Sequence, residues 1–143
     1  MSKALLKSAF TVGLLVLLMS VPVYGASVNK SIKIDAGSES DGATSVNGSI
    51  TVGDGAVVTG ALRTVNGKVR IGDDARIEEA GTVNGGLTVG ENVTADGLET
   101  VNGAISVGEG SQIGSEIGAV NGRITLEKGA VAAADIGNVN GSI

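Results

Sequence analysis

The apolar residues of this chain recur in pairs that are separated by a single residue. The first pair of columns places one aliphatic residue every 18 or 19 positions. One column holds Ile50, Val69, Leu87, Ile105, Ile124 and Ile143, and the other holds Val52, Ile71, Val89, Val107 and Leu126. Two inward residues on either side of one outward residue follow the period of a β-strand. The pattern therefore predicts a short strand at the start of every repeat.

Two more strands are predicted in each repeat. A second pair of columns holds Ala56, Ala75, Val93, Ser111 and Ala130, followed by Val58, Ile77, Ala95, Ile113 and Ala132. A third strand starts at Leu62, Ala80, Leu98, Ile117 and Ile136, and we expect the Val of the next Val-Asn-Gly to complete its inward face. Gly and Asp residues separate the strands, as at Gly53, Asp54 and Gly55, where the chain must turn. Three strands and three turns per repeat describe a triangular β-helix.

The tripeptide Val-Asn-Gly marks the start of each repeat. It begins at Val46, Val65, Val83, Val101, Val120 and Val139. We expect an all-β, single-domain solenoid of about five to six turns of 18–19 residues, with neighbouring turns about 4.8 Å apart. An α-helical fold is excluded because the apolar spacing is wrong, and because each of the 24 glycines would cost about 1 kcal/mol inside a helix.

The first 25 residues have the pattern of a secretory signal peptide. Lys3 and Lys7 flank the start of an apolar run over residues 9–19, and the small residue Gly25 precedes the predicted cleavage site. The run is too short for a comfortable membrane span, although an uncleaved anchor is the alternative. We therefore expect an exported protein, located in the periplasm, at the cell surface or outside the cell.

Residues 26–45 fit the repeat less well than residues 46–143. Ile32 and Ile34 alternate with Lys33, which predicts a first strand, and residues 37–42 have the composition of a loop. Terminal repeats of solenoids usually cover the core. We expect this segment to cap the β-helix domain that residues 46–143 form.

The composition excludes several classes of function. Residues 26–143 hold eight basic and fifteen acidic residues and no aromatic residue, which argues against binding to nucleic acid. The chain has no histidine and no cysteine, so it lacks the histidine base of solenoid acyltransferases and offers no nucleophile paired with a base. We therefore expect a protein that is not an enzyme and that needs no cofactor.

Two columns of polar residues are the candidates for a site. One holds Asn47, Asn66, Asn84, Asn102, Asn121 and Asn140. Asn followed by Gly suits a left-handed corner, and stacked Asn amides can hydrogen-bond from turn to turn. The other column, the acidic corner, holds Asp54, Asp73, Glu91 and Glu109. Its carboxylates either extend into water or hold a hard cation such as calcium between them.

The Val-Asn-Gly repeats, the Gly-rich corners and the all-aliphatic core resemble those of the bactofilins, the polymer-forming cytoskeletal proteins. The resemblance covers residues 46–143. It implies a right-handed triangular β-helix, which we favour over a left-handed one, and end-to-end polymerisation without nucleotide. Bactofilins are typically cytoplasmic, whereas this chain carries an export signal.

The last residues of the sequence indicate where assembly would occur. Ile143 lies in its core column in the middle of a predicted strand, and we expect Ile124 and Val139 to lie near the same end. An uncovered turn exposes unpaired backbone groups that another chain can join. The sequence therefore predicts a structural protein that assembles with itself. The alternative is a monomeric rod whose surface binds polysaccharide or other components of the cell envelope.

Overall fold

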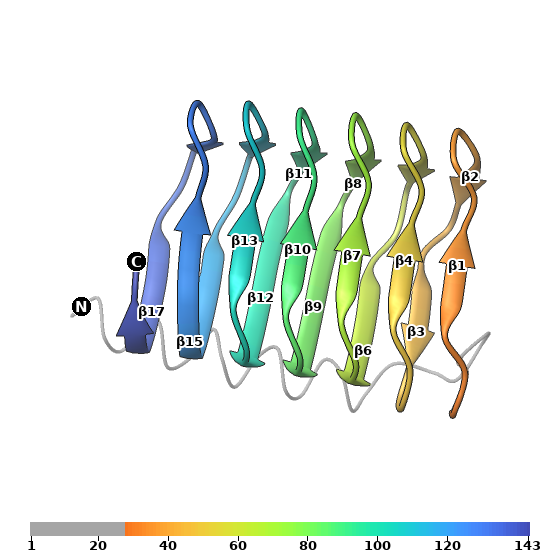
Figure 1. The fold of residues 1–143 in the computed structure, drawn as a ribbon, viewed down its shortest axis with the longest axis horizontal. Coiled ribbons are helices and arrows are strands. Elements are labelled where there is room, and N and C mark those ends of the chain that lie inside the picture. Colours follow the sequence, from red (N-terminus) through yellow and green to blue (C-terminus); the bar gives the residue numbers. More distant parts are fainter. Residues whose placement is uncertain (1–27) are drawn as a thin grey trace.

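The computed structural model describes residues 28–143, which form a β-solenoid of about six turns that contains strands and no helix (Figure 1). The predicted signal peptide, residues 1–25, lies outside the described residues. Each turn of the solenoid has three sides, and the strands on each side stack in parallel on those of the neighbouring turns. The predicted fold class is confirmed.

The first side carries the strand that opens each turn. Its members are β1 (Ile32–Ile34), β4 (Ile50–Val52), β7 (Val69–Ile71), β10 (Leu87–Val89), β13 (Ile105–Val107) and the second half of β15 (Ile117–Leu126). Successive turns are in register, so that Ile50 faces Val69 and Val69 faces Leu87. The two predicted aliphatic columns therefore line this side of the core.

The second and third sides complete the triangle. The second side consists of β2 (Glu39–Ser40), β5 (Val57–Val58), β8 (Arg76–Ile77), β11 (Thr94–Ala95), β14 (Gln112–Ile113) and β16 (Val131–Ala132). The third side consists of β3 (Ala43–Ser45), β6 (Leu62–Asn66), β9 (Glu79–Asn84), β12 (Gly97–Asn102), the first half of β15 and β17 (Ile136–Ser142). Because β15 continues around a corner, the first and third sides form one 11-stranded sheet beside the six-stranded sheet of the second side.

The direction of winding is visible in Figure 1. Strands of the first side run upward in front, and the fainter strands of the third side return downward behind them, while successive turns advance from right to left. The coil is therefore right-handed.

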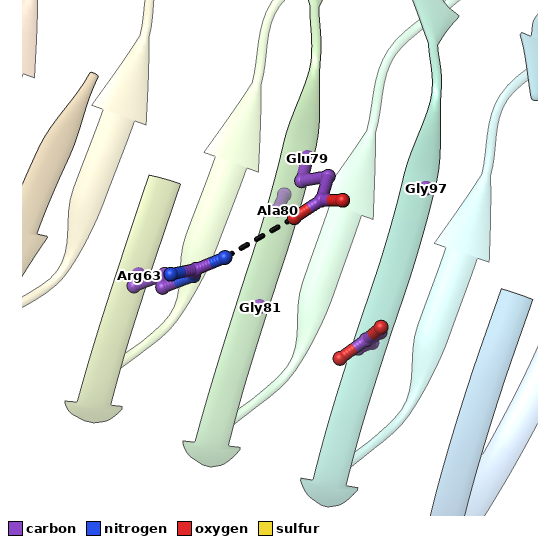
Figure 2. A pocket seen from close by; sticks show the side chains of 6 residues that line it. Arg63, Glu79, Ala80, Gly81 and Gly97 are labelled. Carbon is purple, nitrogen blue, oxygen red and sulfur yellow. Dashed lines mark hydrogen bonds and ion pairs between the residues drawn. The ribbon is translucent and has the colours of Figure 1, made fainter. Parts of the chain in front are cut away.

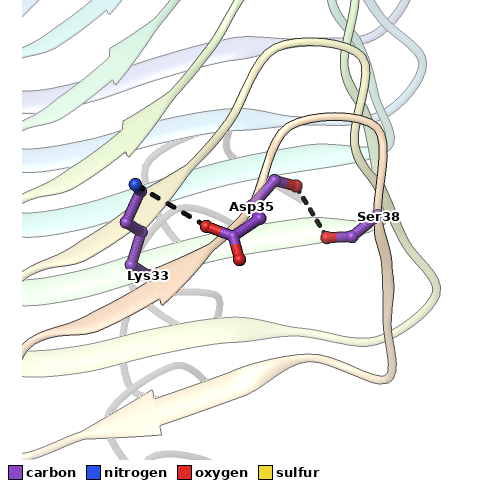
Figure 3. Close-up of polar contacts among 3 residues, drawn as sticks. All are labelled: Lys33, Asp35 and Ser38. Atoms are coloured by element: carbon purple, nitrogen blue, oxygen red, sulfur yellow. Dashed lines mark hydrogen bonds and ion pairs between the residues drawn. The ribbon is translucent and has the colours of Figure 1, made fainter.

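Residues 28–45 form a complete first turn of the solenoid. The sequence predicted a cap with one strand and a loop, but the segment contains β1, β2 and β3, which pair with β4, β5 and β6 of the second turn. The turn opens with Val28-Asn29-Lys30 instead of Val-Asn-Gly, and a search for the tripeptide therefore misses it. Figure 3 shows that Asp35, at the first corner of this turn, accepts a 2.6 Å hydrogen bond from Ser38 Oγ through its carbonyl and forms an ion pair with Lys33 at 3.6 Å.

The inward face of the third side differs from the prediction. The Val of Val-Asn-Gly does not point into the core; Val46 is exposed and Val65, Val83, Val101 and Val120 are half-buried. The residue before each Val is buried instead, in a column that holds Ser45, Thr64, Thr82, Thr100 and Ala119. The strand period of two explains the difference, since it leads from Leu62 to Thr64 and not to Val65.

Candidate functional site

The asparagine corner, where Val-Asn-Gly joins the third side to the first, carries a continuous ladder of amides. Each Asn Nδ2 donates to the Oδ1 of the Asn in the preceding turn, over distances of 2.8–3.0 Å. The ladder contains all six predicted residues and starts one turn earlier, at Asn29. Hydrogen bonding from turn to turn is therefore confirmed. These amides are used within the solenoid, which supports a structural role.

The glycine that follows each Asn serves a different purpose from the predicted one. Neither residue of the Asn-Gly pairs has a positive φ, so the prediction of a left-handed corner is wrong here. A Cβ on Gly67, Gly85 or Gly103 would instead overlap the carbonyl oxygen of the equivalent glycine in the preceding turn. Close approach between turns, and not backbone conformation, therefore requires glycine at this position.

Left-handed residues occur at the acidic corner, between the first and second sides. Gly55 has a φ of 66°, and the equivalent Asp74 and Asn92 have values of 56° and 53°. Gly, Asn and Asp are the residues that tolerate this conformation best. Each lies one position after an acidic residue of the predicted column.

The acidic column contributes hydrogen bonds between turns. Asp54 Oδ1 accepts from the backbone N–H of Asp73 at 3.0 Å, and Asp73 Oδ1 accepts from that of Glu91 at 2.9 Å. All four predicted acidic side chains, including Glu109, are exposed. Within residues 28–143, no group of three or more acidic side chains is arranged to hold a metal ion. The structure therefore gives the first two carboxylates a role as acceptors for the next turn.

A buried hydroxyl column braces the asparagine corner from inside, and the hydropathy pattern missed it. Thr64, Thr82 and Thr100 donate to the carbonyl oxygens of Gly48, Gly67 and Gly85 at 2.8–3.1 Å. A buried hydroxyl is costly unless it is hydrogen-bonded, and here each one closes its own turn across the corner. The recurring Thr-Val-Asn-Gly sequence was the signal that could have identified it.

A small charged cluster lies on the outer face of the third side. Arg63 Nη2 and Glu79 Oε2 form an ion pair at 3.1 Å (Figure 2). Gly81 faces both Arg63 and Glu99 in the neighbouring strands and leaves a hollow of about 10 Å³ between them. Burial raises the pKa of the Glu99 carboxyl from 4.5 to about 7; the carboxylates of Glu79 and Glu116 add to this rise, and the Arg63 guanidinium opposes it.

This pKa makes the stability of the protein depend on pH. Glu99 holds its proton more tightly in the folded chain, so its contribution to stability is complete below pH 4.5 and is lost as the pH rises to about 7. We expect Glu99→Gln to melt at a higher temperature than the wild type at about pH 8 and at a similar temperature near pH 4. Glu109→Gln, which removes one exposed negative charge at the acidic corner, is the control. An equal change for Glu99→Gln at both pH values would contradict this assignment.

The ends of the solenoid differ from its middle turns in the exposure of apolar side chains. Among residues 28–143, five large apolar residues are exposed, and four belong to the first turn or follow β15: Val28, Val131, Val139 and Ile143. Six further apolar residues pack against the core but are only partly buried, and they too lie in the first and last turns: Ile32, Ala43, Leu126, Ala130, Ala132 and Ile136. Both end faces therefore present an aliphatic cross-section that no further turn covers among the described residues.

The predicted assembly residues occupy different places at this end. Val139 and Ile143 are 52% and 67% exposed, whereas Ile124 is 1% exposed and belongs to the buried core. An open hollow of about 490 Å³ lies beside Ile143. It is lined by Arg123, Ile124, Thr125, Leu126, Ser142 and Ile143. The hollow borders the Ile124–Leu126 edge of β15, at the position that the next strand of the first side would occupy.

No protein-family model, curated protein or solved structure matches the chain. Residues 28–143 include no helix of the length and apolarity that a membrane span requires. Among the described residues, the exposed apolar side chains at the two ends of the solenoid are the best candidate for a functional site.

Proposed function

We propose that this chain is a non-enzymatic structural protein that assembles with itself by stacking the open ends of its solenoid. One observation carries the proposal. Exposed and half-covered apolar side chains gather in the first and last turns, whereas core residues such as Leu87 and Leu98 in the middle turns are at most 1% exposed. A second copy placed on an end would cover these side chains.

The backbone supports the same conclusion. Among the described residues, β16 ends the second side and β17 pairs only with β15, so both keep one unpaired edge. At the opposite end of the described range, β1, β2 and β3 each pair with a described strand on one edge only. Unpaired edges recruit further strands. Because all strands are parallel, the last turn of one copy fits the first turn of another, and such a contact repeats without closing.

Stacking of this kind matches what the resemblance to bactofilins implies, and the right-handed solenoid agrees with it. We place the assembly in the periplasm or at the cell surface, because the first 25 residues have the pattern of a signal peptide. The partner in this proposal is the chain itself, and no cofactor takes part.

Sedimentation and negative-stain electron microscopy of the purified protein test the proposal. We expect particles that lengthen with protein concentration, and we expect Ile143→Lys to abolish this growth because it places a charge in the core column of the contact. Thr88→Lys is the matched control, since its exposed side chain lies in the outward column of a middle turn, beside Arg70 and away from both ends. A wild-type protein that stays monomeric at all concentrations would favour a surface-binding rod instead.

A further inference from the structure

The described residues form six full turns and then the first five residues of a seventh. These five residues occupy the same positions in their turn as the first five described residues do in theirs. Asn29 and Asn140 occupy the same corner position at the two ends of the amide ladder, with six turns between them. The segments around them are nearly identical: Val28–Ile32 reads Val-Asn-Lys-Ser-Ile, and Val139–Ile143 reads Val-Asn-Gly-Ser-Ile. We call them the first segment and the last segment.

This overlap creates a conflict in any end-to-end stack. If the sheets continue from one copy into the next, the last segment of the first copy and the first segment of the second copy would have to occupy the same part of one turn. We call this part, the asparagine corner and the start of the first side, an arc. Only one of them can lie between the Val120–Ile124 arc below and the Val46–Ile50 arc above. The other must leave its place.

The side chain of Lys30 determines which of the two segments is displaced. A Cβ at Gly141 would overlap the carbonyl oxygen of Gly122, and every later Asn-Gly glycine meets the same restriction from the turn before it. Lys30 occupies this position in the first turn, where no described turn precedes it. Stacked on Gly122 of another copy, the first segment would therefore place the Lys30 Cβ into that carbonyl. The last segment, with Gly141, makes no such clash.

We propose that the copies join by strand exchange, in which Val139–Ile143 of one copy replaces Val28–Ile32 of the next. This inference rests on the proposed function, since it specifies the contact through which the ends stack. The displaced first segment leaves its arc, and the Gly48 of the second copy then lies on Gly141 instead of on Lys30.

The exchange preserves the contacts that the first segment makes. In one chain, Asn47 N donates to the carbonyl of Val28 at 2.8 Å, and Asn47 Nδ2 donates to Asn29 Oδ1 at 2.9 Å. Ile32 N donates to the carbonyl of Ser49 at 2.9 Å, and Ser31 Oγ accepts from Ser49 N at 3.3 Å. The last segment offers the same groups on Val139, Asn140, Ser142 and Ile143. Replacement therefore loses no hydrogen bond at this arc.

The rest of the junction gains contacts that a single chain lacks. With Ile143 in the place of Ile32, the following Lys33 and Ile34 of the second copy enter the hollow beside Leu126. The register continues β16 with β2 and β17 with β3, so that Ala43 covers Ile136. Asn138 Oδ1, which is buried without a hydrogen-bond partner among the described residues, then lies below the turn that contains Ser45. All three sides of the solenoid continue across the junction.

Cysteine cross-linking between two single-site variants tests the exchange, because the native chain has no cysteine. Exchange places Asn140 of one copy beside Asn47 of the next, at the turn spacing of about 4.8 Å, which falls within the Cα separation of a disulfide. We expect a mixture of Asn47→Cys and Asn140→Cys proteins to form a disulfide-linked heterodimer on oxidation. Within a single chain these two positions are five turns apart.

A mixture of a second pair of cysteine variants tests the opposite arrangement, in which the first segment keeps its place. If the last segment leaves and the first segment stays, Asn29 of one copy lies beside Asn121 of the other. Heterodimers of Asn29→Cys with Asn121→Cys, or assembly without either cross-link, would overturn the exchange and leave the proposed stacking intact. A wild-type protein that sediments only as a monomer would overturn both.

Two substitutions at the equivalent positions provide an independent check. Gly141→Lys gives the last segment the sequence of the first and should abolish assembly, while thermal melting reports that the remaining turns stay folded. Lys30→Gly leaves the last segment unchanged, so assembly should remain at the wild-type level. A large gain of assembly from Lys30→Gly would show that the first segment is retained in the stack, contrary to the exchange.

Discussion

Gly85→Ala should lower the free energy of unfolding by about 3 kcal/mol, the upper part of the range for forced overpacking. The added Cβ would overlap the carbonyl oxygen of Gly67 and would lie 2.7 Å from its carbonyl carbon and 3.3 Å from Thr82 Oγ1. The backbone cannot yield easily, because Gly67 N and Gly85 N donate at 3.2 and 3.0 Å to the next turns. Chemical denaturation followed by circular dichroism measures the change.

Gly97→Ala is the matched control for this substitution. A Cβ at Gly97 would lie 3.6 Å from the Glu116 carbonyl oxygen and 3.9 Å from Glu79 Cγ, which are ordinary contacts. Since φ at Gly97 is not positive, Ala restricts the unfolded chain without strain, and stability should stay equal or rise by about 0.5 kcal/mol. Equal losses at both positions would show that the asparagine corner is not closely packed.

Leu98→Ala should destabilise the protein by about 3 kcal/mol, within the range for large aliphatic side chains in cores. Leu98 is fully buried between Ala80 and Ile117 of the adjacent turns, so the cavity has walls on both sides. Leu126→Ala removes the same atoms from the last turn, where the side chain is only partly covered. Its cost should be clearly smaller in dilute monomeric protein, as measured by urea denaturation.

The two Leu variants together also report on assembly. If stacking covers Leu126, the cost of Leu126→Ala should rise with protein concentration, whereas that of Leu98→Ala should not. Equal costs at every concentration would contradict an uncovered last turn.

The sequence was sufficient to predict the triangular solenoid, because aliphatic residues at the strand period define the first two sides directly. It was insufficient on the third side. Thr82 is buried through a hydrogen bond to a carbonyl on the far side of a corner, and a hydropathy pattern does not register such a bond. Reading the period strictly from Ala80 would have reached Thr82, so this feature was present in the sequence.

Other features depend on the neighbouring turn and could not be read from one repeat. Gly85 is required by the Gly67 carbonyl, which is adjacent only after the chain has coiled. The raised pKa of Glu99 likewise follows from burial beside Glu79 and Glu116, which belong to other turns. The first turn was missed because Lys30 replaces glycine, and a side chain at this position fits there because no described turn precedes it.

The amide ladder gives any filament of this protein two chemically different tips. Every Asn side chain donates toward the start of the chain and accepts from the turn that follows. One tip therefore exposes the spare amide hydrogens of Asn29, and the other exposes the spare carbonyl oxygen of Asn140. Growth from a seed should then proceed at unequal rates in the two directions, and a fragment added in reverse orientation would bring like groups together and fail to extend it.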